Sequence, residues 1–314
     1  MGLKLFIDGA AGTTGLEIAD RLSGRADIVP ITLDEHKRKS AAARRDALNA
    51  ADLAILCLPD DAAREAVAMI DAGGTTRVID ASSAHRTSPG WTYGFPELVG
   101  RDVVAEARLV SNPGCYPTGF LALLAPLVQA GMLPADWPYT TNAVSGYSGG
   151  GRPLIQRFEQ NRGIVHRAYG LSLGHKHLEE MRVHAGLRHR PVFSPAVAAA
   201  FRGMIVDVPL PLHAILGAAS AAAMHVCLCE HYASQRLVRV MPMSPERLEL
   251  LLTKDAEPWD GLDLYVHGSA DGTQARLIAR LDNLGKGASG AAVQTLNLMV
   301  GADEHTGLRL TEKV

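Results

Sequence analysis

The N-terminal third of the chain alternates short apolar runs with segments of helical spacing. Residues 3–8 are an apolar run that ends at a glycine-rich turn, and apolar positions in 16–22 recur with the period of a helix. Further apolar runs predict strands at 29–33, 52–58 and 77–80, with a helix at 61–72 between the last two. Because 52–58 is apolar on both faces and strands alternate with helices, we expect a doubly wound parallel sheet of the α/β class.

The pattern changes near residue 115. A helix is predicted over 117–130, and strand-like segments follow at 139–145, 201–208, 223–229, 237–240 and 263–268. Few helices separate these strands, which indicates an α+β domain with a mostly antiparallel or mixed sheet. Residues 285–300 predict a glycine-rich turn leading into an amphipathic helix that returns to the first domain.

We therefore expect two domains. The first contains residues 1–114 together with the returning segment 286–314, and the second contains residues 115–285. A length of 314 residues agrees with two domains, and 47% hydrophobic against 20% charged residues is enough apolar material for a packed core. A broad sheet in the second domain suggests a partner subunit, so we expect a homodimer or homotetramer.

Charge and cysteine content exclude several classes of protein. The net charge of −2 provides no field for collecting nucleic acid or anionic lipid, and no run approaches the roughly 20 apolar residues of a membrane span. We therefore expect neither nucleic acid nor a membrane as a partner. Four cysteines are too few for a disulfide framework, and the N-terminus does not resemble a secretion signal, so we expect a cytoplasmic protein.

The turn after the first strand carries the spacing of a dinucleotide-binding fingerprint. It provides the predicted phosphate-binding residues Gly9, Gly12, Thr13, Thr14 and Gly15. Glycines there allow a tight turn and bring backbone N–H groups at a helix N-terminus close to a pyrophosphate. The alternative is that these glycines only permit close packing of the strand against the helix.

The end of the second strand bears on the choice of cofactor. Lys37 and Arg38 favour NADP if they face the ribose 2′-phosphate, whereas Asp34 favours NAD if it faces a 2′-hydroxyl. A solvated charged loop is a third interpretation.

One cysteine stands out as a nucleophile. Cys115 lies between turn-forming residues directly before a predicted helix, and the dipole at a helix N-terminus favours the thiolate. Cys57 falls in an apolar strand, and we interpret Cys227 and Cys229 as small core residues that alternate within the predicted strand 223–229.

The segment 174–180 offers acid/base chemistry. It places His175 and His177 two residues apart and Glu180 just beyond them. A histidine beside a cysteine, with a carboxylate fixing its tautomer, is typical of a thiolate nucleophile with a general acid/base. The spacing matches no common zinc site, so we expect no metal. The other histidines, among them His85, His166, His184 and His189, are interpreted as surface or packing residues without such company.

Together these segments resemble the short form of the N-acetyl-gamma-glutamyl-phosphate reductase family. The resemblance rests on GAAGTTG at 9–15, ASSAHR at 81–86, YGFPEL at 93–98, SNPGCYPTG at 111–119, VSGYSGGGR at 144–152, GHKHLEE at 174–180 and NLGKGASGAAVQTLNLM at 283–299. These motifs cover nearly the whole chain in the family's order, and the cysteine and VSGYSGGGR segments are its most specific parts.

The resemblance implies a fold like the glyceraldehyde-phosphate and aspartate-semialdehyde dehydrogenases. In that fold, residues 1–114 and 286–314 would form an NADP-binding Rossmann domain, and residues 115–285 would form a catalytic and oligomerisation domain. The resemblance also implies NADPH-dependent reduction of a small-molecule substrate, N-acetyl-glutamyl 5-phosphate, to N-acetyl-glutamate 5-semialdehyde and phosphate, a step of arginine synthesis. Cys115 would be the nucleophile, His175 the acid/base and Glu180 its partner, and Ser82 would join the cofactor-binding residues.

The substrate carries a phosphate and an α-carboxylate, which calls for cationic or N–H-rich pockets. Arg86 and Arg152 lie within the family-like segments and can bind either group with two N–H donors. We add Asn112 and His177 as substrate-binding residues and leave open which arginine takes which group.

Two departures from the family pattern affect the site. Leu178 and Glu179 replace the Thr-Pro that follows the histidines in the long form, so the choice between His175 and His177 stays open. Gly285 stands where a larger apolar residue is common, which bears on packing beside the nicotinamide.

Other functions remain as alternatives. Within the same class, the chain could be an aspartate-semialdehyde dehydrogenase or a reductase of a carrier-linked glutamyl or aminoadipyl phosphate. A different class would be a non-catalytic NADP sensor, although a sensor has no need of a thiolate beside an imidazole.

Overall fold

The computed structural model describes residues 2–244 and 246–310, which divide into two compact units. Unit 1 contains the described residues of Met1–Gly114 and Ala288–Leu308, and unit 2 contains those of Cys115–Gly287 and Arg309–Val314. The predicted Rossmann domain also includes residues 1 and 311–314, which lie outside the described residues. The functional assignment of the two domains stays a prediction.

Unit 1 is built on a parallel sheet, which confirms the predicted α/β class. Within the described residues the sheet has six strands in the order β2-β1-β3-β4-β6-β5, and every pairing is parallel. The strands are β1 (Leu3–Asp8), β2 (Ile28–Ile31), β3 (Leu53–Leu56), β4 (Arg77–Asp80), β5 (Thr92–Tyr93) and β6 (Leu109–Ser111).

Helices cover both faces of this sheet. They are α1 (Thr13–Leu22), α2 (Ala41–Ala50), α3 (Asp60–Ala68), α4 (Pro96–Val99), α5 (Arg101–Glu106), α10 (Gly290–Met299) and the 3₁₀ turn η1 (Glu35–Lys37). One core cluster joins Ile18 of α1 and Val293 of α10 to Ile55 of β3. The other joins Leu48 of α2 and Ala63 of α3 to the opposite side of the strands. The sheet is therefore doubly wound.

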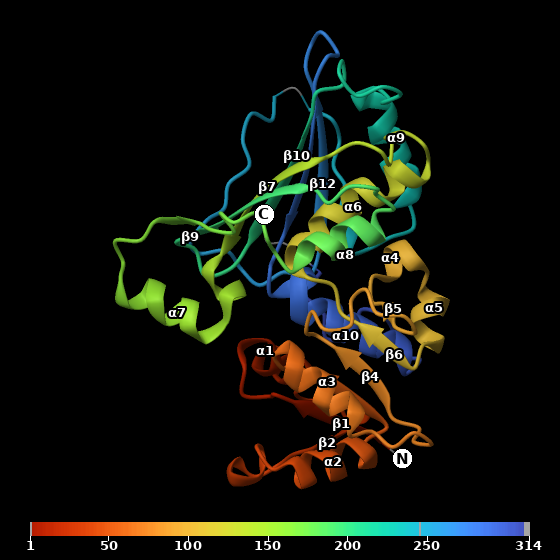
Figure 1. The fold of residues 1–314 in the computed structure, drawn as a ribbon, viewed down its shortest axis with the longest axis vertical. Coiled ribbons are helices and arrows are strands. Elements are labelled where there is room, and N and C mark those ends of the chain that lie inside the picture. The colour runs from red at the N-terminus through yellow and green to blue at the C-terminus, as the bar shows by residue number, and fades with distance from the viewer. Residues whose placement is uncertain (1, 245, 311–314) are drawn as a thin grey trace. The chain divides into compact units, whose positions relative to one another are not determined.

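The last helix of unit 1 comes from the far end of the sequence. Figure 1 shows α10, coloured blue, beside β4 and α5, which are coloured orange. The prediction of an amphipathic helix here is wrong, because almost every residue of α10 is buried. Two of its buried polar residues are hydrogen-bonded through their amides: Gln294 donates to Glu97 and Glu304, and Asn297 donates to two backbone carbonyls.

Unit 2 contains the predicted mixed sheet. Its described strands follow the order β11-β12-β13-β10-β7-β9-β8, with antiparallel pairing except between β11 and β12 and between β7 and β9. They are β7 (Thr140–Gly146), β8 (His166–Ala168), β9 (Val192–Ala198), β10 (Met204–Leu210), β11 (Val238–Val240), β12 (Leu262–Gly268) and β13 (Ala275–Leu281).

Helices pack on this sheet as well. They are α6 (Cys115–Gln129), α7 (Gly151–Gln160), α8 (His177–His184), α9 (Ala221–His231), the 3₁₀ turn η2 (Tyr147–Gly150) and the π-helical turn η3 (Gly285–Ser289). Figure 1 shows α6 along the sheet, with α8 and α9 beside it. No described helix is long and apolar enough to cross a membrane.

The prediction of a strand at 223–229 is wrong, because this segment lies inside α9. Ser220 caps the helix by accepting a hydrogen bond from the Ala223 N–H, and the alanines that follow favour helix. Cys227 and Cys229 alternate in sequence, but in the helix they are partly exposed rather than core residues. The apolar run is longer than a typical strand, and its length identifies the helix better than its alternation.

Candidate active site

The glycine turn of unit 1 leaves room for a ligand and little room for side chains. The predicted cofactor residues lie in this turn or in the first turn of α1: Gly9, Gly12, Thr13, Thr14 and Gly15. Gly9 has φ +87°, and a Cβ there would lie 2.3 Å from the Cys57 carbonyl oxygen. A Cβ on Gly15 would lie 2.5 Å from the Gly9 oxygen. No side chain caps α1, so the turn fits a pyrophosphate at the helix N-terminus.

The basic residues after β2 are exposed on η1 and the turn that follows it. Lys37 Nζ lies 3.9 Å from the Asp34 carboxylate, and Arg38 donates from Nε to the Leu33 carbonyl at 3.4 Å. The acidic and basic residues that favour different cofactors therefore neighbour each other. Both cations remain within reach of solvent and of a ligand.

Ser82 belongs to a cluster that the sequence analysis missed. Asp80, fully buried at the end of β4, accepts hydrogen bonds from the Ser82 N–H and hydroxyl at 2.9 and 2.8 Å. Nδ1 of His85 lies 2.6 Å from the same carboxylate, and the His85 ring stacks on Trp91 with centroids 4.1 Å apart. The interpretation of His85 as lacking a carboxylate partner is wrong. We call Asp80, Ser82, His85 and Trp91 the Asp80 cluster.

The structure brings two predicted substrate residues together in unit 1. Arg86 is buried, and its Nε donates to the Asn112 carbonyl at 2.9 Å. The Asn112 side chain is 1% exposed and donates from Nδ2 to the Ala288 carbonyl at 3.0 Å. Its Oδ1 has no hydrogen-bond donor within the described part of the chain. A buried acceptor without a donor is costly, so this oxygen is available to a ligand.

In unit 2, Cys115 is the first residue of α6. The thiol is half-buried and belongs to no disulfide among the described residues, and the helix has 15 residues, so its N-terminal dipole favours a thiolate at this position. A Cβ on Gly287 would lie 2.9 Å from the Cβ of Cys115. The π-helical turn η3 therefore passes directly behind the cysteine.

Two tyrosines lie close to Cys115. The Tyr169 hydroxyl donates to the Tyr116 hydroxyl at 3.2 Å, and Tyr116 donates to the Ala196 carbonyl at 3.1 Å. Burial raises the pKa of both phenols, and the negative charge of Cys115 raises each pKa further. Both phenols therefore stay protonated, as hydrogen-bond donors near the sulfur.

His175 completes this group. Its ring centroid lies 6.3 Å from Tyr116, 5.8 Å from Tyr169 and 4.6 Å from His177. Burial, and then the charge of Lys176, lower the pKa of His175 to about 4, so the imidazole is neutral at neutral pH. The His177 N–H donates to Nδ1 of His175 at 3.2 Å, which leaves the proton on Nε2. We call Cys115, Tyr116, Tyr169, His175 and His177 the cysteine cluster.

Three further residues of unit 2 were predicted to belong to the site, and two of them are buried whereas the third is exposed. His177 begins α8, is buried and lies 5.9 Å from Tyr116 between ring centroids. Glu180 is buried on the same helix, and its role as partner of His175 stays a prediction. Arg152 is exposed in the first turn of α7, and its role in binding substrate also stays a prediction.

The other thiols are poorer nucleophiles. Burial and the nearby Asp80 and Asp8 raise the pKa of Cys57 to about 12. Burial, followed by the charge of Glu230, raises the pKa of Cys227 and of Cys229. Within the described residues no group of histidines, cysteines and carboxylates could hold a metal ion.

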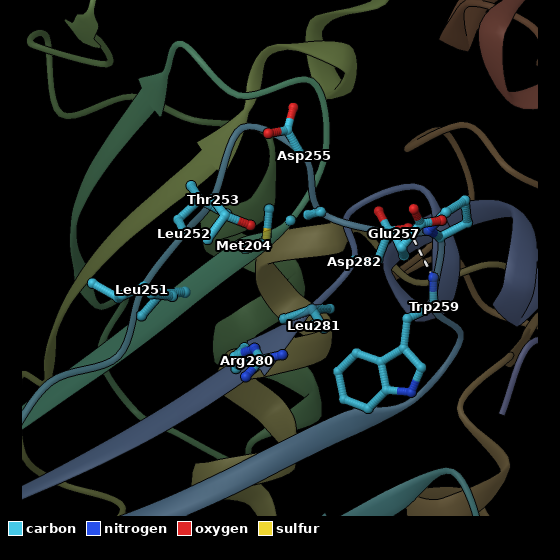
Figure 2. A pocket seen from close by; sticks show the side chains of 14 residues that line it. Met204, Leu251, Leu252, Thr253, Asp255, Glu257, Trp259, Arg280, Leu281 and Asp282 are labelled. Atoms are coloured by element: carbon cyan, nitrogen blue, oxygen red, sulfur yellow. Dashed lines mark hydrogen bonds between the residues drawn. The ribbon is translucent and has the colours of Figure 1, made fainter. Parts of the chain in front are cut away.

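A buried ion pair supports the turn behind the cysteine. Asp282, at the end of β13, accepts from Arg202 at 2.9 Å, from the Leu284 N–H at 2.9 Å and from the Trp259 N–H at 3.3 Å. Figure 2 shows the last of these bonds, in a pocket that Asp282 and Trp259 line with Arg280. Burial raises the pKa of Asp282, and the charge of Arg202 opposes this rise.

Trp259 also explains Gly285. A Cβ on Gly285 would lie 1.8 Å from the Trp259 carbonyl oxygen, so the backbone of Trp259 occupies the space that a larger side chain would need. Next to it, the Lys286 side chain is buried.

The sequence analysis missed Asp80, Asp282 and the tyrosine Tyr169. The two aspartates carry a shared signal, since each is the acid at or just after the end of a strand and directly precedes a motif, ASSAHR or NLGKG. Tyr169 gives no such signal, because only the fold brings it to Cys115.

Comparison with known proteins identifies the family. Residues 4–107 match the family model described as semialdehyde dehydrogenase, NAD binding domain, and residues 115–283 match semialdehyde dehydrogenase, dimerisation domain. The chain therefore belongs to the semialdehyde dehydrogenase family. Similar curated proteins include the N-acetyl-gamma-glutamyl-phosphate reductases of Brucella ovis and Brucella canis. Each is 52% identical over an alignment 308 positions long, which covers 95% of this chain and 99% of the relative. The resemblance drawn from the motifs is confirmed.

Solved structures share the fold at low identity. Aspartate semialdehyde dehydrogenase II of Vibrio cholerae, complexed with ASA, has a TM-score of 0.68 and 15% identity, covering 96% of this chain and 99% of its own. The enzyme of Francisella tularensis has a TM-score of 0.70 and 13% identity, covering 95% and 100%. The Candida albicans enzyme with NADP has a TM-score of 0.66 and 14% identity, covering 95% and 99%.

Proposed function

We propose that the chain is an N-acetyl-gamma-glutamyl-phosphate reductase. It reduces N-acetyl-L-glutamyl 5-phosphate to N-acetyl-L-glutamate 5-semialdehyde with NADPH and releases phosphate, as a step of arginine synthesis. The observation that carries the proposal is the cysteine cluster, in which a thiol at a helix N-terminus lies near protonated phenols and a neutral imidazole. The relatives of this name at 52% identity support the choice of substrate.

Cys115 provides covalent catalysis. Its thiolate attacks the acyl carbon, the acyl–oxygen bond breaks, and phosphate leaves with that electron pair. The product is a thioester on Cys115. When bound, NADPH supplies the hydride that reduces this thioester. Backbone N–H groups at the start of α6 stabilise the oxyanion that forms on the carbonyl oxygen in each step.

His175 acts on the same oxygen. With Nδ1 accepting the His177 N–H, the proton of the neutral ring is on Nε2, where it can donate to the oxyanion. The collapse of the tetrahedral adduct breaks the carbon–sulfur bond and returns the electron pair to Cys115. We assign Glu180 the task of fixing the orientation of α8, where it is buried three residues after His177.

Ligand binding falls to both units. NADP is assigned to Gly9, Gly12, Thr13, Thr14, Gly15, Lys37, Arg38 and Ser82. The turn fits the pyrophosphate for the steric reasons given above, and the exposed cations Lys37 and Arg38 suit a 2′-phosphate. Binding of the substrate's anionic groups is assigned to Arg86, Asn112, Arg152 and His177. The buried Asn112 Oδ1 without a donor supports this assignment.

The domain roles follow from these assignments. We infer that residues 1–114 and 286–314 bind NADP and that residues 115–285 carry the catalysis and the subunit contacts, in a homodimer or homotetramer. The dimerisation model that matches 115–283 supports subunit contacts there. The four cysteines form no disulfide among the described residues, which agrees with a reducing compartment, and we place the enzyme in the cytoplasm.

The test is the reverse reaction. Purified protein is mixed with N-acetyl-glutamate semialdehyde, phosphate and either NADP or NAD at alkaline pH, and the absorbance of reduced nicotinamide is followed. We expect phosphate-dependent reduction of NADP, faster than that of NAD. Faster turnover of aspartate semialdehyde would favour the first alternative. Binding of NADP with no turnover, and no protection of Cys115 from iodoacetamide by substrate, would favour the sensor.

A further inference from the structure

One arginine near the cysteine cluster has no anionic partner among the described residues. Arg167, in the middle of β8, is half-buried with its guanidinium carbon 4.7 Å from the centroid of the Tyr169 ring. Within the described residues it has neither a hydrogen bond nor an ion pair through its side chain. By contrast, Arg182 and Arg190 both bind the Glu179 carboxylate, and Arg202 binds Asp282. A half-buried cation left without an anion is suited to an anionic ligand.

The position of Arg167 connects it to the reactive groups. Tyr169, whose ring supports the guanidinium, donates to the Tyr116 hydroxyl and lies 5.8 Å from His175 between ring centroids. The negative charge of Cys115 raises the pKa of Tyr169, whereas the positive charge of Arg167 lowers it. Arg167 therefore contacts a ring that lies near His175 and within electrostatic range of Cys115.

The contacts that hold the Arg167 side chain and backbone in place favour the binding of a carboxylate. Stacking on a ring face holds the guanidinium plane and leaves the N–H groups at its edge free to donate two parallel hydrogen bonds. The backbone is fixed as well, because Arg167 pairs with Val197 in the ladder between β8 and β9. The side chain thus needs little further ordering when a ligand binds.

We propose that Arg167 binds the α-carboxylate of the acyl substrate. The inference rests on the proposed function and specifies its substrate recognition. Phosphate leaves in the first step, whereas the acyl group stays on Cys115 until reduction is complete. A cation in the unit that carries the cysteine can hold the carboxylate throughout, and Arg167 belongs to that unit. Phosphate is left to the other cations of the site.

The test compares two aldehydes in the reverse reaction. N-acetyl-glutamate semialdehyde and 4-acetamidobutanal differ only in the α-carboxylate, so the ratio of their kcat/KM values measures its recognition. For Arg167→Met we expect this ratio to fall by about 10- to 100-fold, as for a lost charge-assisted hydrogen bond. The KM for phosphate should be unchanged. For Arg167→Lys we expect a ratio between those of the wild type and Arg167→Met, because lysine keeps the charge and loses the paired donors.

Matched variants isolate the guanidinium. Arg162→Met removes an exposed arginine five residues earlier and should leave the ratio unchanged. Tyr169→Phe keeps the ring under Arg167 and should keep the ratio, whereas Tyr169→Leu should lower it. Thermal unfolding shows whether each variant is folded. If Arg167→Met does not fold, Arg167→Lys decides the question by the same ratio.

Two results would overturn the assignment. The first is an unchanged ratio in the folded Arg167 variants. The second is an equal loss on both aldehydes, which would indicate a structural role only. Failure of the proposed function looks different, because the wild-type protein itself would then show no phosphate-dependent oxidation of N-acetyl-glutamate semialdehyde.

Discussion

The Asp80 cluster and the cysteine cluster use similar residue types in opposite ways. In the Asp80 cluster, a buried carboxylate binds a backbone N–H, a hydroxyl and an imidazole. In the cysteine cluster, the imidazole is kept neutral, and the nearby Arg167 has no carboxylate partner in the part of the chain that the structure describes. Groups that bind one another hold a loop in place, whereas groups that the chain leaves without a partner are available to charges that change during a reaction.

The largest effect should come from removing the nucleophile. Cys115→Ser should lower kcat on the order of 10⁴-fold, because a hydroxyl at this position is a much weaker nucleophile than a thiolate. The measurement is the reverse assay with NADP and phosphate. Cys227→Ser on α9 is the control and should keep full activity. Substantial turnover by Cys115→Ser would show that Cys115 is not the nucleophile, and the cysteine cluster would then not differ from the Asp80 cluster in being reactive.

Replacing the neutral imidazole should have the next largest effect. His175→Asn should lower kcat by about 10²- to 10⁴-fold, the range for loss of a general acid/base. His189→Asn changes an exposed histidine that pairs with Asp136, and should have no effect on kcat. If instead His177→Asn lost the activity and His175→Asn kept it, the assignment within the cysteine cluster would be reversed.

The turn behind Cys115 should be intolerant of side chains. Gly285→Ala places a Cβ against the Trp259 carbonyl and should cost about 3 kcal/mol of unfolding free energy, as in an overpacked core. Gly73→Ala is the matched control, since nothing lies within 4 Å of its Cβ, and it should change stability by less than about 0.5 kcal/mol. Urea unfolding measures both. Equal stability of the two variants would show that this turn is not tightly packed.

Breaking the Asp80 cluster should cost stability. His85→Phe keeps a ring to stack on Trp91 but removes a donor from the buried carboxylate, which should cost about 2 kcal/mol. His36→Phe, on the exposed turn η1, is the control. A stability loss no greater than that of the control would mean that the imidazole does not hold the Asp80 loop.

The smallest effect concerns pH. The folded protein lowers the pKa of His175 from 6.5 to about 4, so between these values the unfolded chain binds more protons at this residue. The stability tied to neutral His175 is present above pH 6.5 and is lost as the pH falls toward 4. We therefore expect His175→Asn to lose less stability than the wild type between pH 7 and pH 4.5. Parallel loss in both proteins, measured by urea unfolding, would contradict the lowered pKa.

Local patterns were sufficient to predict much of the fold and part of the site. The run before Gly9 and the apolar run after Cys115 predict β1 and α6 because burial and turn chemistry act over a few residues there. The alternation of apolar residues at 223–229 predicts a strand, but the segment forms a helix that is capped by Ser220. Partners far apart in sequence could not be predicted, as with Arg202 and Asp282, which are 80 residues apart and meet only in the folded sheet.

Helix α10 belongs to unit 1 but is encoded near the C-terminal end of the sequence, and this affects how the chain folds during synthesis. Ala292, Val293 and Leu296 belong to the same core cluster as β1, β3, β4 and β6, yet all of unit 2 up to Gly287 is translated between them. While the ribosome adds those residues, α1 covers one apolar face of the nascent N-terminal sheet only in part, because α10 has not yet been made. The final packing of this face must wait until translation has passed Met299, and until then its uncovered apolar side chains are exposed to aggregation.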